Sequence, residues 1–308
     1  MLKLEITGRV RYNETGCQVA VKETIKEEST CHQNATRIQI GWQIDQDFIE
    51  QLSLCHDKLT ANTLYSMGRI IGASIQADDE TNKRPSFRKG QFYSGIDVDR
   101  AYTQSGQMST IVQQFGATLA AKYINVSKSH YFARGHLAPD GDFIDAASQD
   151  ATYYYINVAP QWQSVNNGNW KALESATRNL AANRASTFTT YTGGFDILKL
   201  PNSQGEDTPI YLAPDKKNNS LIPVPKYYWK VVHDPLRNQA TAFVTFNNPH
   251  LSDVNAEDIF CKDVCDQLSW VTWQRRKIPS GYTFCCTAQA LSDAIPFAPK
   301  LGKLQLLD

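Results

Sequence analysis

One imidazole stands in a sequence context that suits acid–base chemistry, in the segment 131–139 (YFARGHLAP). His136 follows a glycine, has Arg134 two positions before it, and precedes a loop limited by Pro139. A histidine that is neutral near physiological pH can accept a proton from water, so His136 is a candidate general base. A single histidine in such a loop is more often a hydrogen-bonding turn residue, and His130 is the nearest alternative base.

A second group of polar side chains begins at Asn166, at the start of a predicted helix. An amide oxygen in that position can face a hard cation such as Mg²⁺. Glu174 lies eight residues after Asn166 and Arg178 four residues after Glu174, so all three can share one helix face. The alternatives are ordinary ones. Asn166 can be a helix N-cap, and Glu174 with Arg178 can be a solvated ion pair.

Two further sets of polar residues accompany these groups. The block from Asn157 to Gln161 reads Asn-Val-Ala-Pro-Gln and closes a predicted buried strand. Asp140 and Asp142 resemble the start of a calcium-binding loop, but the later ligand positions of such a loop are missing. We therefore interpret both aspartates as turn residues.

The hydrophobic pattern around these groups predicts an α+β fold, with a central antiparallel sheet and flanking helices. Residues 36–44 and 47–55 alternate apolar and polar side chains and predict a β-hairpin, and residues 62–76 predict a strand or a short helix. The other predicted elements are a helix at 108–123, a buried strand at 150–158 closed by Pro160, an amphipathic helix at 167–184, and strands near 187–198, 208–213, 226–233 and 239–247. We divide the chain into a β-rich segment at 1–60 and a main domain at 61–308.

Composition and charge exclude two classes of protein. The 308 residues are 42% hydrophobic and contain no run of eighteen apolar residues, so a substantial core is expected and a membrane-spanning helix is not. Lysine and arginine total 31, as do aspartate and glutamate, so the net charge is zero. A protein that coats nucleic acid through bulk basicity is therefore excluded, whereas a local cluster of arginines is compatible with this balance.

Seven cysteines indicate disulfides and an oxidising, secreted setting; they stand at 17, 31, 55, 261, 265, 285 and 286. Cys31 and Cys55 lie at the same end of the predicted hairpin and form our preferred pair. The four C-terminal cysteines predict two further disulfides, in an order that their spacing leaves open. Zinc is the alternative, but the adjacent Cys285 and Cys286 are an awkward pair of tetrahedral ligands.

Glycosylation sequons and the N-terminus bear on the same setting. Sequons begin at Asn13, Asn34, Asn125 and Asn218, two of them close to cysteines. The N-terminal residues include no apolar segment typical of a secretory signal, and the cysteine count is odd. We expect a preceding segment to carry both the signal and a partner cysteine.

In these blocks the chain resembles the DNA/RNA non-specific endonucleases of the ββα-metal type. The family signature is Asp-Arg-Gly-His, then an Asn-x-x-Pro-Gln strand end, then an Asn-x-Gly-x-Trp-x-x-Leu-Glu helix. This sequence matches it in order at residues 133–136, 157–161 and 166–174. Within the family the chain is most similar to secreted arthropod nucleases such as insect double-stranded RNases and crustacean duplex-specific nuclease. The C-terminal cysteines and the stretch Asn247–His250 belong to that narrower similarity.

The resemblance implies a role for each matched residue. His136 is expected to deprotonate the attacking water, Asn166 to be the direct protein ligand of Mg²⁺ (or Mn²⁺), and Glu174 to hold a metal-bound water. Arg84 matches an upstream arginine of the family and is expected to stabilise the transition state. Arg134 and Arg178 are expected to bind neighbouring phosphates, with Lys83, Arg88 and Lys89 extending the basic groove. Asn157 and Gln161 are expected to support the site and the bound substrate.

The implied activity is hydrolysis of phosphodiester bonds in double-stranded RNA or DNA, without sequence preference and leaving 5′-phosphate ends. Nucleic acid is the expected partner, with no membrane and no obligate protein partner. The chain departs from the signature at Ala133, where the family has aspartate. We interpret the change as one of metal affinity. The alternative function is a catalytically weak nucleic-acid-binding protein that retains the nuclease fold.

Overall fold

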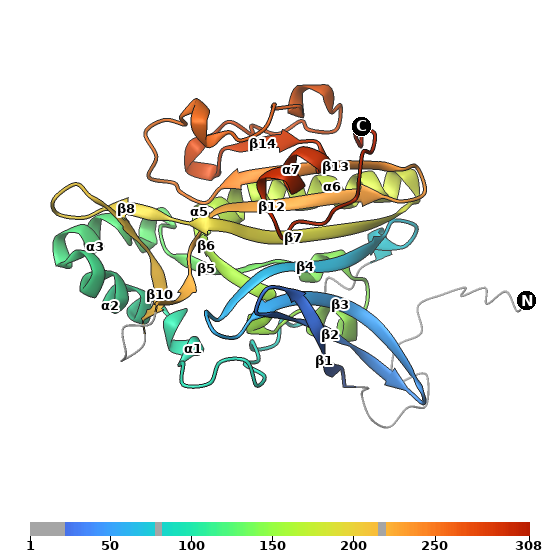
Figure 1. Ribbon diagram of the computed structural model, residues 1–308, viewed down its shortest axis with the longest axis horizontal. Coiled ribbons are helices and arrows are strands. Elements are labelled where there is room, and N and C mark those ends of the chain that lie inside the picture. The colour runs from blue at the N-terminus through green and yellow to red at the C-terminus, as the bar shows by residue number, and fades with distance from the viewer. Residues whose placement is uncertain (1–21, 78–81, 215–219) are drawn as a thin grey trace, which may run out of the picture.

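One large antiparallel sheet organises the chain (Figure 1). The computed structural model describes residues 22–77, 82–214 and 220–308. Eight strands of this part pair in the order β1-β2-β3-β4-β7-β12-β13-β14, each antiparallel to its neighbour. They are β1 (Thr24–His32), β2 (Ala35–Ile44), β3 (Asp47–Asp57), β4 (Asn62–Ile71), β7 (Thr187–Ile197), β12 (Pro225–Asp234), β13 (Gln239–Phe246) and β14 (Thr283–Cys286).

The remaining elements lie on or beside this sheet. Short paired strands are β5 (Phe132–His136) with β6 (Val158–Trp162), β8 (Lys199–Pro201) with β9 (Asp207–Pro209), and β10 (Tyr211–Pro214) with β11 (Ser220–Pro223). The α-helices are α1 (Val98–Ala101), α2 (Gln104–Phe115), α3 (Ala117–Tyr123), α4 (Ala146–Asp150), α5 (Gln163–Val165), α6 (Lys171–Arg184) and α7 (Ala288–Ala294). The predicted α+β class with a central antiparallel sheet is confirmed. No helix in the described ranges is both long and apolar enough to cross a membrane.

Helices α6 and α7 cover opposite faces of the sheet. Successive side chains of a strand point to opposite faces, and β12 shows this alternation. Val232 packs with Leu173 of α6, whereas Trp229 packs with Leu291 of α7. All four side chains are buried. The even-numbered residues of β12 from Tyr228 to Val232 therefore face α6, and their side chains lie beneath that helix.

The predicted hairpin and four of the predicted strands are confirmed. Residues 36–44 and 47–55 form β2 and β3, and residues 62–71 form β4, followed by a 3-10 turn at Ile75–Ala77. The strands predicted near 187–198, 226–233 and 239–247 are β7, β12 and β13. The one predicted near 208–213 is interrupted at Ile210 and becomes β9 and β10. Strands on both sides of residue 60 belong to the same sheet, and the division of the chain there stays a prediction.

The strand predicted at 150–158 is wrong. This stretch leaves helix α4, whose start is capped by Asp145, and passes through a 3-10 turn at Tyr155–Asn157 before β6 begins at Val158. Its three consecutive tyrosines are buried in irregular structure, which mimics the composition of a buried strand. Pro160 does not close a strand. It stands in the middle of β6 opposite Arg134, in a two-stranded ribbon where a missing N–H is tolerated.

Both predicted helices are interrupted at a glycine. Residues 108–123 belong to α2 and α3, which meet at Gly116 with φ +79°. The helix predicted at 167–184 is kinked at Gly168, whose φ of −95° and ψ of −124° are not helical, and α6 proper begins at Lys171. A β-carbon on Gly168 would approach the carbonyl oxygen of Ser280 to 2.5 Å. The kink thus lets the chain pass close to the C-terminal loop.

Three disulfides join the described cysteines, and the preferred pair Cys31–Cys55 is confirmed. The order that spacing left open is Cys261–Cys286 and Cys265–Cys285. The zinc alternative is excluded for these four residues, because their sulfur atoms are bonded to one another. Cys17 lies outside the described residues.

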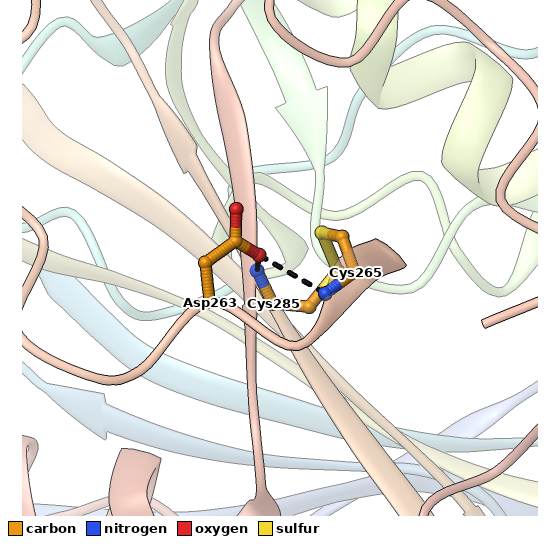
Figure 2. Close-up of side chains that lie close together, drawn as sticks. All are labelled: Asp263, Cys265 and Cys285. Atoms are coloured by element: carbon orange, nitrogen blue, oxygen red, sulfur yellow. Dashed lines mark hydrogen bonds between the residues drawn. A yellow bond between two sulfur atoms is a disulfide. The ribbon is translucent and has the colours of Figure 1, made fainter. Parts of the chain in front are cut away.

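The carboxylate of Asp263 comes close to the Cys265–Cys285 bridge, but it does not form a metal site with it (Figure 2). Its Oδ1 atom accepts hydrogen bonds from the backbone N–H groups of Cys265 at 3.0 Å and Cys285 at 3.1 Å. Because both sulfurs belong to a disulfide, neither is a thiolate ligand. Asp263 therefore fastens the C-terminal loop to β14.

The contact between β4 and the end of α6 predicts a strong effect of one methyl group. A β-carbon at Gly72 would meet the Ala181 carbonyl oxygen and come within 2.5 Å of the Ser186 carbonyl oxygen. We expect Gly72→Ala to lower the free energy of unfolding by more than about 2 kcal/mol, measured by urea denaturation. Gly68→Ala is the matched control, since its β-carbon would find ordinary contacts from 3.5 Å outward. Equal effects of the two substitutions would contradict the packing described here.

Candidate active site

The imidazole of His136 is placed by the short ribbon of β5 and β6. His136 is the last residue of β5 and pairs with Val158, the first residue of β6. The preceding Gly135 allows the ribbon to lie close to the sheet. A β-carbon there would come within 2.6 Å of Gln161 Oε1 and 2.8 Å of the Tyr228 hydroxyl. Glycine is therefore required at position 135 of the signature for a steric reason, because any side chain there would push the ribbon and His136 away from the sheet.

Aromatic rings enclose His136. The centroid of its ring lies 5.2 Å from that of Phe87 and 5.1 Å from that of Tyr153. Burial lowers the pKa of His136 to about 4, although the carboxylate of Asp140 opposes the shift. Its Nε2 atom is buried and has no hydrogen-bond partner in the described part of the chain. His136 is therefore a neutral imidazole at physiological pH, the state that a general base requires.

The loop at 82–91 reaches the site because its backbone is pinned to the segment before β6. The N–H of Arg88 donates to the Tyr153 carbonyl at 2.9 Å, and the N–H of Tyr155 donates to the Arg88 carbonyl at 3.0 Å. This pairing carries Phe87 to His136 and leaves the side chain of Arg84 78% exposed. An exposed guanidinium beside the candidate base is free to meet a phosphate.

Asp140 links the exposed arginine to the histidine. Its Oδ2 atom accepts from the Tyr153 hydroxyl at 2.6 Å and lies 3.1 Å from Nε of Arg84. Burial alone would raise the pKa of Asp140, but the Tyr153 hydroxyl, the charge of Arg84 and the Gly141 N–H lower it on balance. Asp140 is thus an ionised carboxylate that holds Arg84 on the side of His136, and it is more than a turn residue.

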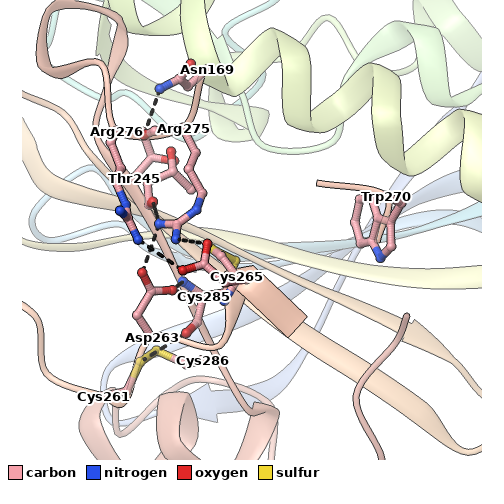
Figure 3. Close-up of a disulfide and its surroundings, with 12 residues drawn as sticks. Asn169, Thr245, Cys261, Asp263, Cys265, Trp270, Arg275, Arg276, Cys285 and Cys286 are labelled. Atoms are coloured by element: carbon pink, nitrogen blue, oxygen red, sulfur yellow. Dashed lines mark hydrogen bonds and ion pairs between the residues drawn. A yellow bond between two sulfur atoms is a disulfide. The ribbon is translucent and has the colours of Figure 1, made fainter. Parts of the chain in front are cut away.

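Asn166 stands in the kinked turn before α6. Its φ of −57° and ψ of −49° are helical and the N-cap of α6 is Trp170, so Asn166 is not an N-cap. The turn is anchored instead by Asn169, whose Nδ2 donates to the carbonyls of Arg275 at 3.0 Å and Gly281 at 2.7 Å (Figure 3). The side-chain amide of Asn166 makes no hydrogen bond to the described residues and is partly exposed. It is available to a ligand.

Behind Asn169, the C-terminal loop is held by a buried arginine. Arg275 donates to the carboxylates of Asp263 at 2.8 Å and Asp266 at 2.6 Å, next to the two C-terminal disulfides (Figure 3). The same residue gives its backbone carbonyl to Asn169. The disulfide-bonded loop therefore sets the position of the turn that carries Asn166.

Glu174 and Arg178 lie one turn apart on α6, and no ion pair joins them within the described residues. Arg178 Nη1 donates instead to Asp142 Oδ1 at 3.1 Å. Burial raises the pKa of Glu174 to about 7, and the ammonium of Lys230 on β12 is the strongest opposing influence. The interpretation of the pair as a solvated i,i+4 ion pair is therefore wrong. Glu174 is poised to change its protonation near neutral pH.

The side chain of Arg134 is held in one orientation by its neighbours. Its guanidinium lies 5.4 to 5.5 Å from the ring centroids of Phe87, Tyr102 and Tyr155, and its Nε donates to the Tyr155 hydroxyl at 3.1 Å. Cation–π contacts on three sides fix its orientation. The side chain keeps partial exposure, so any phosphate it binds meets a rigid group.

Asn157 and Gln161 are fully buried and lie beneath the site. The Asn157 amide joins Ala138 and Thr152, accepting from the Ala138 N–H at 3.1 Å and donating to the two carbonyls at 2.8 and 2.9 Å. It thereby holds the loop that follows His136. Both polar atoms of the Gln161 amide have no hydrogen-bond partner in the described structure. Direct contact of either residue with a substrate stays a prediction.

Other basic residues considered from the sequence are placed differently. His130 precedes β5 and packs against His250 at a centroid distance of 4.7 Å. Strand β5 alone separates it from His136 by about 13 Å at a rise of 3.3 Å per residue. Arg88 pairs with Glu23, and Lys89 lies 2.6 Å from Asp99, whereas Lys83 is exposed. Of these residues, only Lys83 extends an exposed basic surface around Arg84.

Sequence reasoning missed four residues that contact the predicted ones. Asp140 and Asp142 follow His136 by four and six positions, close enough for the spacing to have indicated them as partners of the two arginines. Tyr153 and Lys230 carry no local signal of this kind, because they reach the site only through the tertiary fold.

Comparisons with known proteins show which family the sequence matches. The family model for DNA/RNA non-specific endonuclease matches residues 20–291. The chain is 32% identical over 273 residues to a salivary endonuclease of Lutzomyia longipalpis, covering 86% of this chain and 62% of that protein. It is also 31% identical over 140 residues to a nuclease of Serratia marcescens, covering 42% of this chain and 47% of the relative. The chain thus spans less than two thirds of the length of these relatives.

A solved structure of a complex of EndoG with EndoGI, a study of EndoG inhibition, is similar to this chain with a TM-score of 0.46 and 18% identity. The similarity covers 76% of this chain and 89% of that one. The family match extends over most of the sequence and includes β5, the turn Asn166–Trp170 and α6, the segments that carry His136, Asn166 and Glu174. This chain belongs to the DNA/RNA non-specific endonuclease family.

Proposed function

We propose that the chain is a divalent-metal-dependent endonuclease that hydrolyses phosphodiester bonds of double-stranded RNA or DNA, leaves 5′-phosphate ends and has little sequence preference. One observation carries the proposal. His136 is a half-buried, neutral imidazole whose buried Nε2 has no partner in the described structure, and the exposed Arg84 is among the charges that act on it. Family membership supports the same chemistry.

Each residue has a defined task in this proposal. His136 accepts a proton from the attacking water, which its neutral state permits. Arg84, held by Asp140, stabilises negative charge on the phosphate in the transition state. Arg134 and Arg178 bind neighbouring phosphates from fixed orientations, one among aromatic rings and the other on Asp142. Contacts to phosphates carry no sequence information, so cleavage is expected along any sequence.

The donor set fits Mg²⁺ or Mn²⁺. Oxygen ligands suit these hard cations, and the free amide of Asn166 supplies one in the turn that leads into α6, the helix of Glu174. The unpartnered buried amide of Gln161 and Nε2 of His136 are polar atoms that a ligand or an ordered water would satisfy. Asn166 would hold the cation directly, and Glu174 would accept hydrogen bonds from its water shell. When bound, the cation supplies positive charge to the scissile phosphate and the departing 3′ oxygen.

Ala133 leaves the site without the signature carboxylate, and it is the observation that favours the rival function, a catalytically weak nucleic-acid-binding protein. Ala133 pairs with Gln161 in the β5–β6 ribbon. The charges of Asp140 and Asp142 both act on Glu174, so acidic groups are present from the turn that follows the signature. We infer that these groups maintain the negative field that attracts the cation, and that activity is retained.

We infer that the protein works outside the cell. Three disulfides require an oxidising compartment, and salivary proteins are among the relatives. The sequon at Asn34 lies in the exposed turn between β1 and β2, where a glycan would meet solvent. The sequons at Asn13 and Asn218 fall outside the described residues.

The roles of His136 and Asn166 predict two different defects. His136→Ala should reduce single-turnover cleavage by about 10²–10⁴-fold with nearly unchanged affinity for nucleic acid, because only proton transfer is lost. Asn166→Ala should raise the Mg²⁺ concentration needed for half-maximal activity, because the direct ligand is lost. Both are measured with a labelled duplex at several Mg²⁺ concentrations, and His130→Ala is the matched control. A loss below tenfold for His136→Ala would identify another base.

The raised pKa of Glu174 predicts a pH-dependent gain in stability on removing its charge. The folded protein keeps this proton up to about pH 7, whereas the unfolded chain releases it near pH 4.5. The contribution of Glu174 to stability is therefore full below pH 4.5 and lost as the pH rises through 7. With a chelator present at pH 8, Glu174→Gln should have a free energy of unfolding up to about 3 kcal/mol higher than that of the wild type, measured by urea denaturation. At pH 5 the two proteins should have similar free energies of unfolding. The idea fails if the two pH values give the same difference.

The substrate class is tested by digesting matched single- and double-stranded RNA and DNA in one buffer. We expect duplexes to release acid-soluble products with Mg²⁺ and none with EDTA, with cut sites scattered along the sequence and 5′-phosphate ends. Binding without product release in Mg²⁺ or Mn²⁺ would favour the catalytically weak binding protein. A few dominant cut sites in unrelated substrates would contradict the absence of sequence preference.

A further inference from the structure

A buried lysine lies under the site and has no task in the chemistry above. Lys230 is 1% exposed and stands in the middle of β12, on the face that α6 covers. Its ammonium donates to the hydroxyl of Thr192, its cross-strand neighbour on β7, at 2.7 Å. No other hydrogen bond of this ammonium is found in the described part of the chain. One neutral partner does not offset the loss of water around a buried charge, so negative groups must do so.

Those negative groups come from the site. Burial lowers the pKa of Lys230, whereas Asp142 of the turn after His136 and Glu174 of α6 oppose that shift and Arg178 adds to it. Asp142 is itself 5% exposed and accepts a hydrogen bond from Arg178. Two carboxylates and two cations thus interact between α6, the turn and β12; Lys230 and Asp142 are buried, whereas Glu174 and Arg178 keep partial exposure.

The geometry also ties Lys230 to the turn that carries Asn166. The ammonium lies 5.8 Å from the ring centroid of Trp170, which is fully buried. Trp170 comes four residues after Asn166 and four before Glu174, so the lysine contacts the segment between the proposed metal ligand and its carboxylate. Lys230 cannot touch a nucleic acid, because it is buried beneath that segment.

We propose that Lys230 is a positioning residue for the reaction: its buried ammonium, anchored on Thr192 and packed against Trp170, is the counter-charge to Glu174 that keeps α6 seated over the sheet. The proposal rests on the proposed function, in which Glu174 acts as a carboxylate. The charged groups that face Glu174 are Lys230, Asp142, Arg178 and Asp140. Of these four groups, only Lys230 belongs to the sheet. Of the two cations, Arg178 lies within ion-pair distance of a carboxylate, whereas Lys230 has no carboxylate within that distance in the described residues.

The proposal is tested first by the pH dependence of cleavage at saturating Mg²⁺. In Lys230→Met the acidic limb of kcat should move up by about one pH unit, because an uncompensated Glu174 takes up its proton more readily. KM for the duplex should change less than about threefold, since phosphate contacts remain. Lys226→Met is the matched control. It removes an ammonium from the same strand, where Lys226 pairs with Asp258 at 2.7 Å, and should leave the limb in place.

A double-mutant cycle on stability gives a readout that does not depend on activity. With a chelator present at pH 8, adding Lys230→Met to the wild type should clearly lower the urea midpoint of unfolding. Adding the same substitution to the Glu174→Gln variant should lower the midpoint much less, because the carboxylate that needed compensation is gone. If Lys230→Met does not fold alone, recovery of folding in Lys230→Met with Glu174→Gln supports the proposal. Failure of the double variant to fold overturns it.

Failure of this proposal is distinguishable from failure of the proposed function. If the acidic limb of Lys230→Met coincides with that of the wild type, or the two stability changes simply add, Lys230 has only a packing role. If Glu174→Gln alone retains full cleavage, the assigned role of Glu174 is wrong, and with it the positioning role of Lys230. A shifted limb together with non-additive stability is the result expected.

Discussion

Four ionisable side chains meet between α6 and the sheet, and they have to balance one another because little water reaches them. Lys230 rises from the sheet, Glu174 and Arg178 descend from α6, and Asp142 enters from the turn that follows His136. Removing any one leaves an uncompensated charge in a medium of low polarity, where the penalty is several times that at a surface. The relative positions of helix, turn and strand are therefore coupled, and so are those of Asn166 and His136, which are attached to them.

A second constraint acts from the C-terminal side. The kink at Gly168 brings the chain against Ser280, and Asn169 fastens it to the backbone of Arg275 and Gly281. Since Arg275 is itself held by acidic residues next to two disulfides, the turn bearing Asn166 is supported by covalent links more than ninety residues away in the sequence. A ligand on that turn meets a rigid frame. Rigidity of this kind matters because small displacements of catalytic groups cost large factors in rate.

Local patterns predicted much of this arrangement, and tertiary pairing explains the rest. Alternation of apolar residues predicted β2 and β3, since register in a hairpin follows from the pattern, and it led to the bridge Cys31–Cys55, which joins β1 to β3. Spacing could not order the C-terminal bridges. Cys285 and Cys286 point to opposite faces of β14, so one joins the cluster beneath α6 and the other the cluster beneath α7. The tyrosines at 153–155 misled the prediction because burial in a turn and in a strand selects the same residues. The burial of Lys230 could not be predicted from the local sequence either, since an isolated lysine in a strand is typical of an exposed face.

The three disulfides lie at the two edges of the large sheet. Strand β1 forms one edge and β14 the other, and each edge carries a bridge to a more distant segment. Edge strands are where a sheet begins to fray and where a protease finds an extended chain to bind. Closing both margins covalently raises the free energy of that first opening while leaving the central strands beneath α6 unaltered. Resistance to unfolding and to proteolysis is thus built into the margins of the sheet, away from the groups proposed to carry the chemistry.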